Sequence, residues 1–201
     1  MLTPQFVPVD GTSEIAIEDL TPVGDEVDTD GGITIQTLTA GGRTEAMYQW
    51  IDWGEPTGWC DDEWNLVEGV TFTPGQGLWV TGTGTGAGIQ YAGKVGTSDI
   101  TVQLRAGATA TGNPFPTTIN LQDIIPEGDE VDTDGGITIQ TLTAGGRTEA
   151  MYQWIDWGEP TGWCDDEWNL VEGVTFPAGQ GLWVTGTKNT EYLRFPAPDL
   201  N

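Results

Sequence analysis

Hydrophobic and polar residues alternate along much of the chain, and this pattern predicts β-strands. Residues 33–38 (Ile-Thr-Ile-Gln-Thr-Leu) alternate cleanly, and Gly41-Gly42 then predicts a turn into residues 46–53, so these two segments are expected to form a hairpin. No window of helical length carries a sustained apolar stripe at i, i+3 and i+4. The pattern therefore predicts an all-β fold.

Three further segments extend this prediction. Residues 70–72 and 78–81 flank the turn 73–77, whose Pro-Gly pair suits a tight turn, and they predict a second hairpin. Residues 100–104 predict another strand. Residues 119–125, which are followed by a proline, fit either one helical turn or a short strand, and their spacing leaves both open.

A long internal repeat organises the chain. Residues 24–83 recur as residues 128–187, and all but two of the 60 aligned residues are identical. The two differences are Thr73-Pro74, which become Pro177-Ala178. We therefore expect two tandem, near-identical domains, each sandwich-like or barrel-like, over residues 1–96 and 97–201.

The second half opens with the strand predicted at residues 100–104, whereas the first half shows no counterpart to it. The first domain is therefore expected to lack a leading strand, which a neighbouring copy would supply by strand addition in a filament.

Charge and composition exclude several classes of function. The 31 acidic and 6 basic residues give a net charge of −25, which repels nucleic acid and anionic membrane surfaces. The absence of histidine excludes a histidine base, a Ser-His-Asp triad and histidine-containing metal sites. No apolar run is long enough for membrane insertion.

The duplicated block favours a protein that is not an enzyme, because a repeated module gains avidity whereas enzymes seldom duplicate an intact site. Carboxylate pairs such as Asp52 and Glu55 would suit glycoside hydrolysis in principle. With eleven acidic residues in each block, however, no single pair stands out.

The acidic segment at residues 25–32 and its copy are the candidate metal sites. Alternating carboxylates followed by glycine can wrap oxygens around Ca²⁺, but the spacing matches a complete calcium loop only in part. A solvated acidic turn is the simpler reading. The candidate calcium ligands are Asp25, Asp28, Asp30, Asp129, Asp132 and Asp134.

Ten tryptophans are more than two small domains need. Their flat faces suit stacking on sugar rings or anchoring an interface, although most are expected to fill the cores. Trp53 and Trp59 flank the turn-rich residues 54–58, so these two and their copies, Trp157 and Trp163, are the candidate ligand-binding platforms.

Each half contains one cysteine at the equivalent position, so a disulfide within a half is impossible. Cys60 and Cys164 are candidates for a disulfide between the halves or between chains, if their Cα atoms lie within about 7 Å. Free, partly buried thiols are the simpler alternative.

Three segments carry a family resemblance. They are the strand at residues 100–104, the loop Gly112-Asn113-Pro114-Phe115-Pro116, and the Gly-Gln-Gly-Leu-Trp-Val segment at residues 75–80 with its copy at 179–184. Together they resemble repeat modules of uncharacterised secreted and cell-surface bacterial proteins. The resemblance implies export, an extracellular or cell-surface location, a β-fold and a role in adhesion, and it names no ligand.

These observations lead to one functional hypothesis and an alternative. The chain is expected to be a non-catalytic tandem module of an exported bacterial surface protein, serving adhesion or self-assembly. Its partners would be further copies of itself, as a homo-oligomer or filament, or surface glycans. The alternative is a pair of carbohydrate-binding modules that use exposed tryptophans, with Ca²⁺ as a candidate cofactor.

Overall fold

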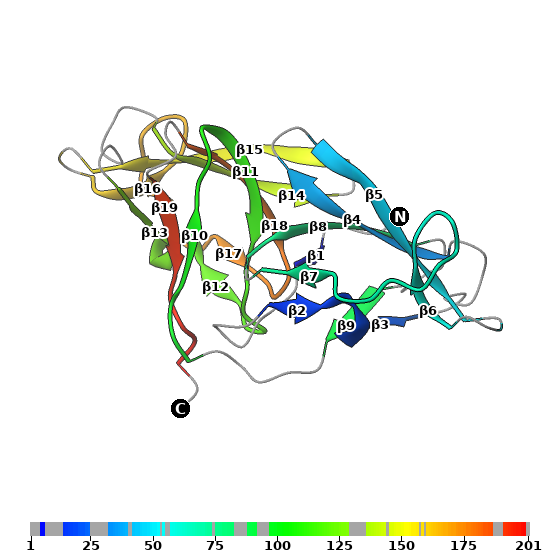
Figure 1. Ribbon diagram of the computed structural model, residues 1–201. Coiled ribbons are helices and arrows are strands. Elements are labelled where there is room, and N and C mark those ends of the chain that lie inside the picture. The colour runs from blue at the N-terminus through cyan, green and yellow to red at the C-terminus, as the bar shows by residue number, and fades with distance from the viewer. Residues whose placement is uncertain are drawn as a thin grey trace.

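The structure of the chain is a computed structural model (Figure 1). It describes residues 5–6, 14–24, 32–39, 42–52, 54, 57–73, 75–82, 88–91, 97–128, 136–143, 145–156, 158, 160–186 and 191–199.

The described residues are almost entirely β-strand, which confirms the all-β prediction. The strands of the first half are β1 (Gln5–Phe6), β2 (Ile15–Ala16), β3 (Leu20–Val23), β4 (Ile33–Thr39), β5 (Gly42–Ile51), β6 (Gly58–Cys60), β7 (Thr71–Phe72), β8 (Gly77–Gly82) and β9 (Gly88–Tyr91). Those of the second half are β10 (Ile100–Gln103), β11 (Gly107–Gly112), β12 (Ile119–Asn120), β13 (Ile125–Glu127), β14 (Thr138–Thr143), β15 (Gly146–Ile155), β16 (Gly162–Cys164), β17 (Thr175–Phe176), β18 (Gly181–Gly186) and β19 (Tyr192–Phe195). Two 3-10 turns, η1 (Ile17–Asp19) and η2 (Leu121–Asp123), complete the fold.

The same five-stranded sheet recurs in both halves. Its strand order is β1-β8-β4-β5-β6 in the first half and β11-β18-β14-β15-β16 in the second. Short pairs, β2 with β7 and β12 with β17, accompany the two sheets. None of the described sheets closes on itself. In Figure 1 the first half, blue to teal, lies at the right and the second half, green to red, at the left.

The hairpin predicted from alternation is present, and the second predicted hairpin is wrong. Strands β4 and β5 pair antiparallel, with Ile35 opposite Tyr48 and a turn at Gly42, whose φ is +109°. Strands β7 and β8 both exist, but β7 pairs with β2 and β8 pairs with β4 and β1. Contacts with distant strands therefore outweigh the local Pro-Gly turn in choosing the partners. The ambiguous residues 119–125 contain both alternatives, a 3-10 turn between two short strands.

Each half has a hydrophobic core of its own. In the first half, Ile33, Ile35, Leu78 and Val80 of the five-stranded sheet meet side chains from the opposite layer, which are Ile15, Ile17, Leu20 and Phe72. The second core is built from residues 100–197 in the same way. Alternation explains this, because every second residue of a strand faces the core. The domain boundary after residue 96 stays a prediction, since residues 92–96 lie outside the described part.

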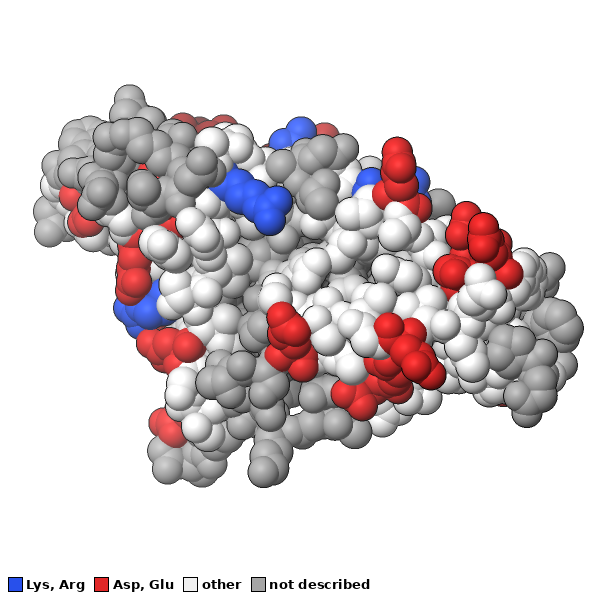
Figure 2. All heavy atoms as spheres, viewed as in Figure 1, with Lys and Arg blue, Asp and Glu red and all other residues white. Residues whose placement is uncertain are grey.

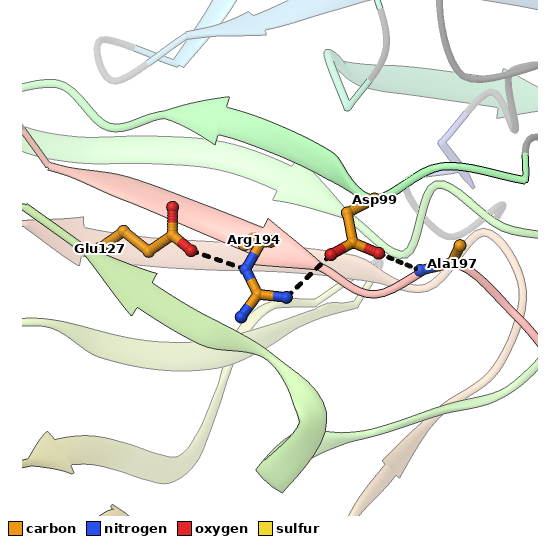
Figure 3. A network of polar contacts seen from close by, with 4 residues as sticks. All are labelled: Asp99, Glu127, Arg194 and Ala197. Carbon is orange, nitrogen blue, oxygen red and sulfur yellow. Dashed lines mark hydrogen bonds and ion pairs between the residues drawn. The ribbon is translucent and has the colours of Figure 1, made fainter.

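Strand β10 distinguishes the second half from the first. It pairs with β19, which pairs on its other side with β13, whereas β9 at the equivalent place pairs with β3. Among the described residues, no strand of the first half occupies the position of β10. Arg194 of β19 holds this edge together: its Nε donates to Glu127 at 2.6 Å and one Nη to Asp99 at 2.8 Å, as Figure 3 shows.

The two halves touch through the turn that precedes β8. Thr111 Oγ1 of β11 donates a buried hydrogen bond of 2.8 Å to the carbonyl oxygen of Gly75. A Cβ atom at Gly75 would lie 2.5 Å from Cγ2 of Val102 in β10. The two positions at which the repeated blocks differ, Thr73-Pro74 and Pro177-Ala178, belong to this turn and to its copy. Sequence difference in the repeat is thus confined to a turn that, in one half, contacts the other half.

Candidate functional site

Two of the four predicted platform tryptophans are core residues, which corrects the expectation that they are exposed. Trp59 is 2% exposed and Trp163 is 0% exposed. The indole Nε1–H of Trp59 donates to the Leu20 carbonyl at 2.8 Å, and that of Trp163 to the Ile124 carbonyl at 2.7 Å. Each ring also meets a tryptophan of the neighbouring strand edge to face, at a centroid distance of 5.5 Å in the first half and 5.4 Å in the second. Buried on all sides, these rings cannot stack on a ligand.

The other platform and metal candidates fall outside the described residues. Trp53 and Trp157 belong to this group, so their role stays a prediction. The same holds for the six candidate calcium ligands, Asp25, Asp28, Asp30, Asp129, Asp132 and Asp134. In the part of the chain that the structure describes, no group of three or more Cys, Asp or Glu side chains is arranged to hold a metal ion.

The two cysteines are buried free thiols and form no disulfide in the structure. Cys60 ends β6 and Cys164 ends β16, and each Sγ contacts the carbonyl oxygen two residues earlier at 3.8 Å. Burial raises the pKa of both thiols above the usual 9.0, and the neighbouring carboxylates of Asp61 and Asp165 raise it further. Both groups therefore stay protonated at neutral pH.

A different pair of tryptophans is exposed, on the loops that follow β6 and β16. We call residues 60–66 and 164–170, which share the sequence Cys-Asp-Asp-Glu-Trp-Asn-Leu, the tryptophan loops. Trp64 is 41% exposed and Trp168 is 40% exposed. Leu66 and Leu170 are 49% and 45% exposed. Each half thus presents the same large apolar side chains to solvent.

An aspartate carboxylate organises each tryptophan loop. Asp61 Oδ1 accepts the backbone N–H of Glu63 at 3.0 Å and that of Asn65 at 2.9 Å, while Asp61 N–H donates to the Asn65 carbonyl at 3.0 Å. Asp165 makes the same bonds in the second loop. Hydrogen bonds to the carboxylate, above all from Asn65, hold the pKa of Asp61 below its usual 3.8. The ionised carboxylate is therefore part of the loop structure.

The tryptophan at the tip has an unusual backbone. Trp64 has φ +68° and Trp168 has φ +69°, and they are the only non-glycine residues of the described chain with positive φ. For a bulky side chain this left-handed conformation is costly, and it persists only where surrounding contacts impose it. The Trp64 N–H donates to the Asp61 carbonyl at 3.2 Å, which is one of those contacts. Such strain is concentrated at functional sites.

Each loop is fixed to the sheet at its base. Gln49 of β5 donates from Nε2 to the Asp61 carbonyl at 3.1 Å, and Val67 N–H donates to the Trp59 carbonyl at 2.9 Å. The equivalent bonds in the second half measure 3.0 Å each. The exposed tryptophan is therefore carried on a short loop whose two ends are bonded to the five-stranded sheet.

The sequence contained a signal for these residues. Trp64 directly follows three consecutive carboxylates, Asp61, Asp62 and Glu63, so it cannot belong to a strand whose neighbours alternate into a core. Trp59, in contrast, lies between Gly58 and Cys60 in a strand, with one face toward the core. The wrong choice came from weighing proximity to glycine-rich turns above the charge of the immediate neighbours.

Comparison with known proteins gives no relative on which to build: no protein-family model matches the chain, and no solved structure matches it. Within the described residues, no helix is long and apolar enough to cross a membrane.

Proposed function

We propose that this protein is a non-catalytic tandem module of an exported bacterial surface protein, and that it serves adhesion through its two tryptophan loops. The observation that carries the proposal is the same exposed tryptophan, at φ +68° and +69°, on an identical loop in each half. An aromatic ring held ready on a rigid loop loses little conformational entropy on binding. Two such rings on one chain add avidity without any new contact.

The chemistry of the loops supports binding in preference to catalysis. The carboxylates of Asp61 and Asp165 are engaged by backbone N–H groups, and their lowered pKa keeps them ionised at neutral pH. Neither can act as a general acid near neutrality, because a catalytic acid needs a pKa near the working pH. The loops therefore offer an apolar surface bordered by fixed negative charge.

Retention on a bacterial surface tests the proposal. Beads carrying the protein would be washed over isolated bacterial cell walls, with the double variant Trp64→Asn/Trp168→Asn as the comparison. Asparagine tolerates the left-handed backbone, so the loop conformation is kept while the ring is lost. We expect the variant to lose most of the retention. Equal retention of variant and wild type would overturn the role of the loops.

Self-assembly is separated from adhesion by size-exclusion chromatography with light scattering over a wide concentration range. A monomer at every concentration supports adhesion to another molecule. Concentration-dependent oligomers that vanish in the Trp64→Asn/Trp168→Asn variant would show that the loops bind a second copy instead.

Glycan binding is the second candidate, and the exposure of Trp64 and Trp168 favours it, because an exposed indole can stack on a sugar ring. Its test is a titration with oligosaccharides followed by tryptophan fluorescence. A saturable change that the double variant lacks would support it, and an unmoved spectrum across neutral and charged oligosaccharides would remove it.

A further inference from the structure

From the charge around the tryptophan loops, we infer that they bind a cationic polypeptide segment, one that carries lysine or arginine side chains. The inference rests on the proposed function and names the chemistry of the partner.

The immediate surroundings of each exposed tryptophan are acidic. Asp61, Asp62, Glu63 and Glu68 lie within nine residues of chain that contain no lysine or arginine, and the second loop repeats them. Asp62, Glu63 and Glu68 are all exposed. Over the first half, at the right of Figure 2, Asp and Glu gather in several groups and few Lys or Arg side chains accompany them. An anionic partner is repelled by this field, and a neutral partner gains nothing from it.

Apolar surface beside carboxylates fits the two parts of a long basic side chain. The aliphatic stem of lysine or arginine covers apolar groups while its charged end stays near anions and water. Leu66, whose Cδ2 lies 3.0 Å from the position of a Cβ on Gly58, is held against β6 and offers a fixed aliphatic surface. The face of an indole attracts the cationic end, and Asp62 and Glu63, next to Trp64 in the chain, supply opposite charge.

A second copy of this chain fits the loops poorly. The chain carries a net charge of −25, and a symmetric contact would place the same acidic loop against itself. Like charges that face each other in an interface are costly. The same charge complementarity that favours a basic partner thus disfavours self-association through this surface.

The test uses a short fluorescent peptide of alternating lysine and leucine, and the same peptide with every lysine acetylated, with binding measured by fluorescence anisotropy. We expect the lysine peptide to bind at least tenfold more tightly than the acetylated one. The Trp64→Asn/Trp168→Asn variant is expected to weaken binding of the lysine peptide at least tenfold.

A charge-matched pair of variants separates the loops from the overall field. In the loop variant, Asp62→Asn, Glu63→Gln, Asp166→Asn and Glu167→Gln remove four charges, so the net charge changes from −25 to −21. In the control, Asp19→Asn, Glu45→Gln, Asp123→Asn and Glu149→Gln remove four exposed charges elsewhere and also give −21. The loop variant should lose at least tenfold in affinity, and the control should stay within about twofold.

Each other outcome contradicts the inference in a recognisable way. Equal weakening by the loop variant and the control would mean that the peptide responds to net charge alone. Unchanged peptide binding in the tryptophan variant, together with lost retention on cell walls, would leave adhesion standing and refute the cationic partner. Unchanged behaviour in both assays would refute the loops as a binding surface altogether, and oligosaccharide binding lost in that variant would assign the loops to glycans.

Discussion

Gln122 and Trp163 are joined by two hydrogen bonds. Gln122 Nε2 donates to the Trp163 carbonyl at 2.8 Å, and the Trp163 N–H donates to Gln122 Oε1 at 3.1 Å. The same Nε2 also donates to the Val171 carbonyl at 2.7 Å, so one side chain fastens both ends of the second tryptophan loop. The equivalent residue of the first half is Glu18, whose Oε1 accepts the Gly69 N–H at 2.7 Å. The identical loops are thus held by different residues outside the repeated block.

Replacing Gln122 by glutamate is expected to destabilise the second loop selectively. Gln122→Glu removes the Nε2 donor and leaves the Trp163 and Val171 carbonyls without this bond, at a cost of about 1–3 kcal/mol. Hydrogen exchange measured by mass spectrometry over residues 160–173 should become faster. The reciprocal variant Glu18→Gln should slow exchange over residues 57–69. If both variants left exchange unchanged, the loops would be held by the sheet alone.

A large change at the loop tip is expected to cost no stability. Trp64→Gly removes a left-handed backbone that costs a non-glycine residue about 1–2 kcal/mol, and glycine returns part of that gain as unfolded-state entropy. The free energy of unfolding in urea should be unchanged or raised by up to about 1 kcal/mol. Trp59→Ala, in contrast, empties a core position and should cost about 3–5 kcal/mol. A strong loss in Trp64→Gly would show that the ring supports the fold.

The contact between the halves is tested at Gly75. Gly69 and Gly75 have nearly the same φ, +72° and +74°, but a Cβ at Gly69 meets nothing within 4 Å. Gly69→Ala should therefore cost only backbone strain, about 1 kcal/mol, whereas Gly75→Ala should cost about 1–3 kcal/mol more through its clash with Val102. Adding Val102→Ala to Gly75→Ala should recover part of that difference in urea unfolding. No recovery would place the cost elsewhere than in the contact between the halves.

The order of the first tryptophan loop should depend on pH through Asp61. Its pKa in the folded protein lies below the usual 3.8, so the ionised form stabilises the loop. This contribution is fully present above about pH 4 and is lost as the pH falls through the folded pKa. Backbone amide shifts of Glu63 and Asn65, followed by NMR, should titrate with a midpoint below 3.8. A midpoint at or above that value, or an unchanged titration in Asp61→Asn, would contradict the role of the carboxylate.

The thiols of Cys60 and Cys164 should be unreactive in the folded protein. Their pKa is raised mainly by burial, so the reactive thiolate is scarce at neutral pH. Ellman's reagent at pH 8 should label neither thiol within minutes, and two per chain after addition of guanidinium. The linked contribution to stability is present below the usual 9.0 and falls as the pH rises above it. A disulfide-linked band on a non-reducing gel would contradict the buried thiols.

Local patterns predicted the strands well and their partners only in part. The segment from Ile33 to Leu38 alternates, and a glycine turn joins it to its neighbour, so β4 and β5 could be paired from sequence. Strand β8 could also be located, but Leu78 to Gly82 pair with β4, more than 40 residues earlier. Such pairing is decided by which core side chains meet in three dimensions, and no local spacing encodes that.

The candidate site was missed for a related reason. Trp59 and Trp64 lie five residues apart in the same polar, turn-rich stretch, and composition alone does not separate them. One is hydrogen-bonded to the Leu20 carbonyl, nearly 40 residues away in the chain, and the other stands on a left-handed backbone. Both facts depend on tertiary contacts that form only once the opposite layer is in place.

The near-identity of the two blocks also has a consequence for how the chain folds. During folding, the β4–β5 hairpin can find the edge of β18 as readily as that of β8, because both edges have the same sequence. Neighbouring repeats of high identity are prone to such exchange between modules. The segments that differ, among them β11 and the turns at residues 73–74 and 177–178, then decide which hairpin is accepted where. Erasing those few differences should slow correct folding far more than it weakens the finished structure.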